Sequence, residues 1–204
     1  SHMKCSRAPV GCRGSVIGQS LAGMAQTVLG PVAPEDLGMT DPHEHLLLDF
    51  SFAFKPPPEA TEYLKAFEPV TEKNLAWVVY DPFRSLDNLV TLDEEVSISE
   101  AKLFYRAGGQ TMIDTTSIGI KRDPLALVRI SRATGINIIM GSGYYIGLLH
   151  PEGMDDKTEE EITEEIVGEG HVQGTAFGFS GTVAVALLQL AEAVDIDLYF
   201  AFHA

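Results

Sequence analysis

Apolar residues along the chain gather in short clusters that Gly, Pro and charged residues separate, a pattern typical of alternating strands and helices. Residues 27–40 hold short apolar pieces around Gly-Pro and Gly, which predicts a small hairpin. Buried strands are predicted over residues 43–48, 111–116 and 136–140, because each is short and largely apolar.

Two amphipathic helices are predicted between these strands. Residues 91–107 carry an apolar face and begin with Thr91 and Glu94, the spacing of a capping box. Residues 124–134 begin with a proline, which suits the first helical position, and Gly135 follows them. Strand, helix and strand in alternation, joined by short Gly-marked connections, indicate a parallel sheet with crossover helices.

The other segments give weaker signals. The three prolines of residues 55–60 exclude helix or central strand there, and the stretch to residue 88 is predicted to be irregular with one or two short helices. The acidic run over residues 158–167 has Ile162 and Ile166 four apart, which predicts the solvated face of an ordinary helix. A helix over residues 182–194 and a last strand over residues 196–203 are expected.

Composition places the chain among globular proteins. It has 204 residues, 45% of them hydrophobic, and 14 Lys+Arg against 29 Asp+Glu give a formal net charge of −15. No run reaches the roughly 20 apolar residues that span a bilayer. Nucleic acid and anionic membranes are therefore not expected as partners, since both require cationic surface.

The N-terminal region is expected to lie outside the fold. Ser1-His2-Met3 is typical of a tag remnant, and residues 1–26 are interpreted as that remnant plus a flexible extension, with a barrel-type domain over residues 27–204. The two cysteines, Cys5 and Cys12, fall in this extension and form neither a disulfide framework nor a four-ligand zinc site. A cytoplasmic location is expected, and the weak apolar stretch ending at Ala25 leaves export as the alternative.

The segment Asp41-Pro42-His43-Glu44-His45 carries the clearest chemistry. Alternate residues of a strand point to one face, so His43 and His45 project together while Glu44 points away. Two imidazoles on one face are able to bind a single transition metal, and a barrel places such sites at strand ends. The alternative is a pair of buried histidines, each with its own hydrogen-bond partner.

Several segments in order resemble the phosphotriesterase family of the amidohydrolase superfamily, particularly its phosphotriesterase-related and lactonase-like members. They are residues 27–32, 37–40 and 43–46 (His-Glu-His-Leu), then residues 108–116 (Gly-Gly-Gln-Thr-Met-Ile-Asp-Thr-Thr), 119–124 and 140–145. The resemblance covers residues 27–167. It implies a (β/α)8 barrel of the TIM type with a two-metal centre at the carboxyl ends of the strands.

The resemblance also implies the ligands. In that family a first-strand His pair binds one metal, a carboxylated Lys or a Glu on the fourth strand bridges both, and further histidines hold the second. His43 and His45 match the first pair. The segment Ile166-Val167-Gly168-Glu169-Gly170 resembles the fourth strand, so Glu169 is the expected bridging ligand, and His203 at the end of the expected fifth strand is a further ligand. The divalent metal is expected to be zinc, two ions in the family with fewer here as an alternative.

Residues beyond the ligands offer fewer signals. Asp114 ends the second predicted strand, where it would either hydrogen-bond a ligand histidine from outside the metal site or be satisfied by local backbone. Residues 121–124 are expected to cap the following helix, with contact to substrate as the alternative.

The chain ends where the sixth strand of such a barrel would begin, so only about the first five β/α units are expected. A barrel takes about 250 residues. The chain is therefore expected to be part of a longer protein, with self-association into a homo-oligomer or a rearranged C-terminal third as alternatives. The function that the resemblance implies is metal-dependent hydrolysis of a small lactone, carboxylic ester or phosphoester by metal-activated hydroxide. A non-catalytic fragment or binding protein with a partial metal site is the second hypothesis.

Overall fold

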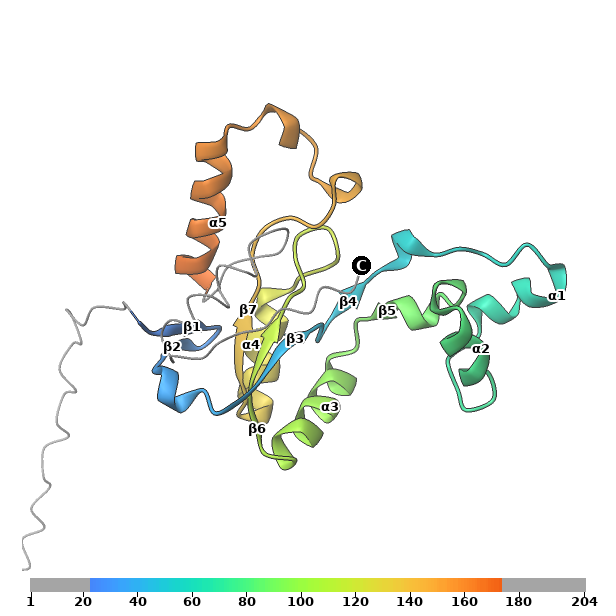
Figure 1. Ribbon diagram of the computed structural model, residues 1–204, viewed down its shortest axis with the longest axis horizontal. Helices are drawn as coiled ribbons and strands as arrows, with labels where there is room; N and C mark the ends of the chain where they lie inside the picture. The colour runs from blue at the N-terminus through green and yellow to red at the C-terminus, as the bar shows by residue number, and fades with distance from the viewer. Residues whose placement is uncertain (1–22, 174–204) are drawn as a thin grey trace, which may run out of the picture.

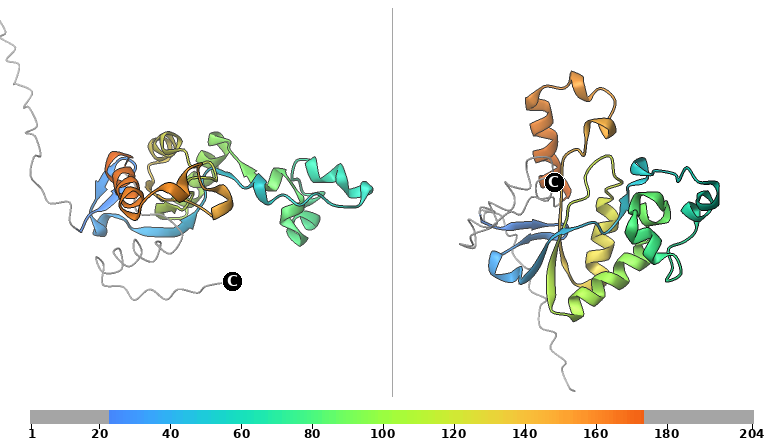
Figure 2. Two further views of the ribbon diagram at one scale, coloured as in Figure 1. Left: turned by 90° about the horizontal axis from the view of Figure 1, so that it is seen from above. Right: turned by 45° about the vertical axis from the view of Figure 1, so that its right-hand side comes forward.

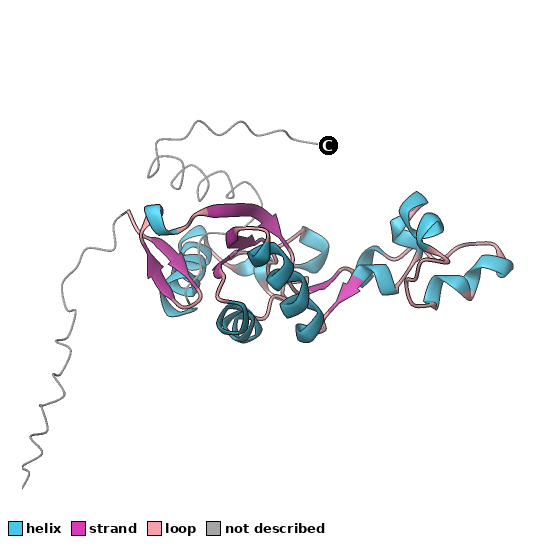
Figure 3. Cartoon of the chain, turned by 90° about the horizontal axis from the view of Figure 1, so that it is seen from below, coloured by secondary structure: helices cyan, strands magenta, loops and turns pink. Residues whose placement is uncertain are grey.

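A three-stranded parallel sheet lies at the centre of the computed structural model, which describes residues 23–173. Its strand order is β3-β6-β7, formed by Met39–Glu44, Gly109–Asp114 and Asn137–Met140 (Figure 1). The helix α3 (Glu94–Arg106) precedes β6 and α4 (Pro124–Thr134) precedes β7, and both cover one face of the sheet (Figure 3). The predicted α/β architecture, with successive β/α units of a barrel-type fold, is confirmed.

Local signals set the limits of α4. The Asp123 carboxylate accepts a hydrogen bond from the Ala126 N–H at 3.0 Å, Pro124 occupies the first turn, and Gly135 ends the helix at φ 78°. This last conformation is left-handed, which glycine adopts without strain. Both predicted limits are confirmed.

The start of α3 differs from the prediction. Asp93, not Thr91, caps this helix, and its carboxylate accepts bonds from the N–H groups of Glu95 at 2.9 Å and Val96 at 3.3 Å. Thr91 belongs instead to β5 (Val90–Thr91), which pairs with β4 (Leu48–Asp49). Thr91 and Asp93 both have side chains that are able to cap a helix. Because Thr91 is held in the pairing of β5 with β4, Asp93 caps the helix instead.

The first strand also ends earlier than predicted. Asp41 lies opposite Met112 and Glu44 opposite Asp114, so β3 holds one residue more than β6 over this interval. Pro42 falls within the irregularity, where a residue without an N–H is tolerated. The strand stops at Glu44, and the predicted strand over residues 43–48 is wrong in its extent.

The core lies between the sheet and its two helices. Its largest fully buried members come from α4, β7 and the connection between them, and they are Leu127, Ile130, Ile136, Ile138 and Met140. Two side-chain hydrogen bonds hold the segments just before and just after β3. Thr111 of β6 donates to the Leu37 carbonyl at 2.6 Å, and Ser97 of α3 donates to the Leu46 carbonyl at 2.5 Å.

A hairpin is present, but over residues 25–32 rather than the predicted 27–40, as β1 (Ala25–Thr27) pairs antiparallel with β2 (Gly30–Val32) and residues 39–40 belong to β3. Its Val28 N–H donates to the Ile138 carbonyl at 2.8 Å, which attaches the hairpin to β7. The domain boundary expected after residue 26 therefore falls inside β1.

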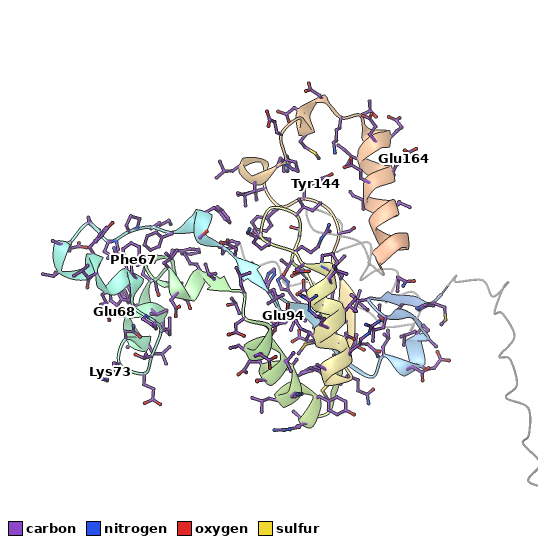
Figure 4. The ribbon with its side chains drawn as sticks, turned by 180° about the vertical axis from the view of Figure 1, so that it is seen from behind. Phe67, Glu68, Lys73, Glu94, Tyr144 and Glu164 are labelled. Carbon is purple, nitrogen blue, oxygen red and sulfur yellow. The ribbon has the colours of Figure 1, made fainter. Side chains whose placement is uncertain are left out.

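Between β4 and β5 the chain makes the predicted irregular excursion, which projects away from the sheet (Figure 2). It holds two short helices, α1 (Ala60–Tyr63) and α2 (Leu75–Tyr80), and several 3-10 turns. Phe67, labelled in Figure 4, packs its ring 5.5 Å from that of Phe54 inside this excursion.

The acidic run forms α5 (Glu159–Gln173), with its glutamates through Glu165 exposed as predicted. Thr158 and Glu161 form a capping box, because the Glu161 N–H donates to Thr158 Oγ1 at 3.2 Å and the Thr158 N–H donates to Glu161 Oε2 at 2.8 Å. In the described range 23–173 no helix is both long and apolar enough to cross a membrane. The elements expected over residues 182–194 and 196–203 lie outside the described residues.

Substituting the two capping candidates of α3 separates their contributions. Asp93→Ala removes the acceptor for two N–H groups, so we expect the free energy of unfolding to fall by about 1 kcal/mol. Thr91→Ala, at an exposed strand position, should change it by less than about 0.5 kcal/mol. Urea unfolding of both variants measures the difference. A larger loss of unfolding free energy for Thr91→Ala would contradict the assignment of Asp93 as the cap.

Candidate functional site

His43 and His45 come together at the carboxyl end of β3. Their ring centroids are 5.3 Å apart and the rings meet nearly at right angles, with an interplanar angle of 79°. His43 is the exposed member, whereas His45, the first residue after the strand, is half-buried. The prediction that the two imidazoles project to one face is confirmed.

The neighbouring strand fixes the orientation of the His45 ring. Its Nδ1 lies 3.0 Å from Thr116 Oγ1, and that hydroxyl also lies 3.3 Å from the Leu47 carbonyl, to which it donates. The hydroxyl has one proton, so with that proton on Leu47 it accepts from Nδ1–H of the imidazole. The other ring nitrogen, Nε2, lies 3.4 Å from Thr115 Oγ1, and that hydroxyl donates to the Glu44 carbonyl at 3.3 Å, so threonine hydroxyls contact both nitrogens of the His45 ring.

The protonation state of His45 suits the same role. Burial, reinforced by the nearby charge of His43, lowers the pKa of His45 from 6.5 to about 4. The imidazole is therefore neutral at neutral pH. A metal ligand must be unprotonated, so no proton has to be displaced from His45 when a cation binds.

Asp114 holds the backbone around this histidine. Its side chain is buried, with Oδ2 accepting from the Leu46 N–H at 2.8 Å and Oδ1 accepting from the Thr116 N–H at 3.0 Å. Burial raises the pKa of Asp114 to about 6, although both hydrogen bonds favour the charged form. Of the two predicted roles, satisfaction by local backbone is the one found. The Asp114 carboxylate therefore positions His45 through the backbone of Leu46 and Thr116 rather than by bonding the imidazole ring.

Glu44 contributes a second anchor. Its carbonyl accepts from the Thr115 N–H at 2.8 Å, and its Oε1 accepts from the His45 N–H at 2.9 Å. The backbone of residues 44–46 is thus bonded on both sides of the histidine, which restricts the positions that its ring can take.

The fourth-strand prediction is wrong. Glu169 lies within α5, and the helical pattern that begins at the capping Thr158 continues through it. The proposed bridging role of Glu169 rested on a strand at residues 166–170, and its side chain lies outside the described part of the structure. His203 lies outside the described residues, so its ligand role stays a prediction.

Within residues 23–173, no group of three or more His, Cys, Asp or Glu side chains is placed to hold a metal ion. The histidine pair is therefore the part of the predicted centre that the described residues supply.

Sequence reasoning did not single out Ser117 or Ser142, and it considered Arg122 only within residues 121–124, as part of a helix cap or as a contact to substrate. Arg122 donates from Nη1 to the Gly141 carbonyl at 3.3 Å, and the hydroxyls of Ser117 and Ser142 are buried without a hydrogen-bond partner in the described structure. Their signal in the sequence was position alone, since each lies in a loop that directly follows a buried strand.

Comparison with known proteins extends the match along the chain. The phosphotriesterase family model matches residues 23–184, which includes the whole of the predicted resemblance. The chain is 40% identical over 151 residues to N-acetyltaurine hydrolase of Xenopus tropicalis, an alignment that covers 74% of this chain and 43% of that protein. The chain thus spans less than half the length of the curated relatives it matches.

Two solved structures have a similar fold. A resiniferatoxin-binding protein from Rhodobacter sphaeroides matches with a TM-score of 0.73 and 32% identity, covering 84% of this chain and 52% of that one. A lactonase from Listeria monocytogenes matches with a TM-score of 0.53 and 21% identity, covering 84% and 54%. The second likeness is one of fold alone.

Removal of the Asp114 carboxylate tests its positioning role. Asp114→Ala leaves the N–H groups of Leu46 and Thr116 buried without this acceptor, so we expect a loss of about 2–4 kcal/mol in unfolding free energy. Amide hydrogen exchange at these two residues should accelerate. Asp155→Ala, the same change at an exposed residue, should alter stability by less than about 0.5 kcal/mol. Equal losses in the two variants would contradict the role.

The pH dependence of stability should separate His45 from Asp114 in metal-free protein. Unfolded His45 binds a proton below about pH 6.5 and folded His45 only below about 4, so its contribution to stability falls as pH falls through that window. Asp114, with its pKa raised to about 6, acts in the opposite direction. His45→Gln should therefore remove the acid loss and leave stability that declines as pH rises from about 4 to about 6. Urea titrations across this window measure it, and parallel pH profiles for variant and parent would refute it.

Proposed function

Because the chain belongs to the phosphotriesterase family, we propose that it takes part in metal-dependent hydrolysis of a small amide or ester substrate. The substrate classes are an N-acyl amide, such as the one named for its vertebrate relative, or a lactone, carboxylic ester or phosphoester. The observation that supports this proposal best is the convergence of His43 and His45 at the carboxyl end of a parallel strand, where barrel enzymes carry their sites.

The donor set fits a divalent transition metal. Two imidazoles at the end of one strand, of which His45 is neutral at neutral pH, are ligands that zinc accepts readily. His43 and His45 would hold the ion. A bound ion supplies Lewis-acid chemistry, lowering the pKa of water and polarising the bond to be cleaved.

The residues of this chain prepare the site. Thr116 and Thr115 contact the two ring nitrogens of His45, and Asp114 and Glu44 fix the backbone that carries the ring. Leu46 and Leu47, the two residues after His45, are buried in the core and so anchor the chain directly after the histidine. Such support holds ligands in place before the ion arrives, which preserves the binding energy that ordering them would otherwise cost.

A complete two-metal centre requires more ligands than this pair. The chain covers 43% of the length of its vertebrate relative, so the activity of the whole protein is part of the proposal. The second hypothesis is a non-catalytic chain that binds one ion through the histidines. Within the described residues no group of three or more possible ligands is found, so those residues by themselves fit one ion better than a two-metal centre.

Metal content and hydrolysis measured together test the function. The parent protein is expected to bind about two zinc ions per chain and to hydrolyse N-acetyltaurine, an aliphatic lactone or a phosphotriester. A His43→Ala/His45→Ala double variant should lose at least one ion and all activity, whereas His150→Ala, a histidine in the loop after β7, should retain both. One bound ion without hydrolysis would support the non-catalytic hypothesis. No ion in the parent would contradict both.

A further inference from the structure

Two consecutive threonines just beyond β6 contact the two nitrogens of the His45 ring. Thr116 Oγ1 lies 3.0 Å from Nδ1, and Thr115 Oγ1 lies 3.4 Å from Nε2. Thr115 is 5% exposed and Thr116 is 1% exposed, so water has little access to either hydroxyl. The imidazole is thus the middle member of a buried row of hydrogen-bonding groups.

Each threonine hydroxyl also reaches a backbone carbonyl on its far side. Thr116 Oγ1 lies 3.3 Å from the Leu47 carbonyl, and Thr115 Oγ1 lies 3.3 Å from the Glu44 carbonyl. The row therefore has an acceptor at both ends, and its members in order are Leu47, Thr116, His45, Thr115 and Glu44. A hydroxyl has one proton, so each threonine donates either to its carbonyl or to the ring.

The row has two arrangements of its protons when the ring is neutral, because a neutral imidazole donates from one nitrogen and accepts at the other. In the first arrangement, Nδ1–H donates to Thr116, Thr116 donates to Leu47, and Thr115 donates to Nε2. In the second, Thr116 donates to Nδ1, Nε2–H donates to Thr115, and Thr115 donates to Glu44. The same distances between non-hydrogen atoms serve both arrangements.

The two arrangements differ in what they offer to a cation. In the first, Nε2 carries a lone pair, and the Thr115 hydroxyl is able to leave it by turning its proton to the Glu44 carbonyl. In the second, Nε2 carries a proton. A metal ion binds a lone pair, so only the first arrangement allows Nε2 to bind one. Nδ1 is bonded to Thr116 in both, and that contact is the shorter of the two.

We propose that Thr115 and Thr116 act in opposite directions on metal binding by His45. Thr116 favours the arrangement in which Nε2 carries the lone pair, and Thr115 competes with the metal for that lone pair. The inference rests on the proposed function and adds the residues that set the metal affinity of its histidine pair. Both threonines are therefore positioning residues, which act through the ring of His45.

Backbone bonds hold the two threonines in place independently of their hydroxyls. The Thr116 N–H donates to Asp114 Oδ1 at 3.0 Å, and the Thr115 N–H donates to the Glu44 carbonyl at 2.8 Å. Valine has nearly the shape of threonine without the hydroxyl. Replacement of either threonine by valine should therefore change the hydrogen bonds of the ring while the backbone beside it stays in place.

The dissociation constant for zinc, measured by competition with a chromogenic chelator, tests the opposite directions. Thr116→Val removes the acceptor for Nδ1–H and favours a proton on Nε2, so we expect the constant to rise about 10-fold. Thr115→Val removes the competing donor and the acceptor for Nε2–H, so we expect it to fall about 3-fold. Thr116→Ser keeps the hydroxyl and should restore the parent value. Thr111→Val, at a buried threonine of β6 that donates to the Leu37 carbonyl, is the matched control and should bind zinc as the parent does.

Nitrogen NMR of the metal-free protein reports the arrangement directly, because protonated and unprotonated ring nitrogens have well separated chemical shifts. The signals of His45 are identified by their loss in His45→Gln. At neutral pH we expect the ring proton on Nδ1 in the parent and in Thr115→Val. In Thr116→Val it should lie on Nε2, where Thr115 accepts it.

The two measurements separate this inference from the proposed function. If the parent binds zinc but Thr115→Val binds it no more tightly, or if Thr116→Val keeps its proton on Nδ1, the inference is overturned and the metal site remains. If the parent binds no zinc, the proposed function fails and the nitrogen shifts decide alone. A proton that moves to Nε2 only in Thr116→Val would then support the opposed roles of the two hydroxyls, and any other pattern would overturn them.

Discussion

The buried carboxylate of Asp114 is the interaction on which the candidate site depends. It stands at the end of β6 and accepts one N–H from each side of the junction with β3, Leu46 on one and Thr116 on the other. Leu46 follows His45, and Thr116 is the hydrogen-bond partner of its ring. A single side chain therefore fixes both the backbone next to the histidine and the residue whose hydroxyl contacts its Nδ1.

Burying this carboxylate is unfavourable, as its raised pKa shows. The N–H groups of Leu46 and Thr116 offset that penalty, because both donate to the buried carboxylate. A neutral apolar residue in this position would fill the same space and leave both donors unsatisfied. The carboxylate is thus retained in the core because it is the acceptor for two N–H groups next to the irregular end of β3, where the extra residue near Pro42 disturbs the strand pairing.

Local sequence signals predicted much of this arrangement. Two of the wrong predictions concern positions that are set by pairing with segments distant in the sequence. The limits of α4 follow from Asp123, Pro124 and Gly135, all of which act within a few residues of the helix. The end of β3 and the start of α3 depend on pairing with distant segments, so Thr91 carried a plausible capping signal that β5 overrode. Glu169 was assigned by likeness to a strand, but the helix begun by Thr158 and Glu161 continues through it. The histidine pair was predictable because alternation along an extended segment is local, whereas its partner Thr116 comes from 71 positions away.

The same carboxylate also changes how β6 and β7 are bonded beyond their strand ends. Because the Thr116 N–H is bonded to Asp114, it does not continue the ladder to β7, and the Gly141 carbonyl accepts Arg122 instead. The guanidinium reaches the sheet edge as a consequence of the bond that supports His45. An ordinary ladder here would pair the Thr116 N–H with the Gly141 carbonyl, which would then be occupied by the ladder and not by Arg122. One carboxylate thus supports the backbone around His45 on one side and leaves the Gly141 carbonyl to the Arg122 guanidinium on the other.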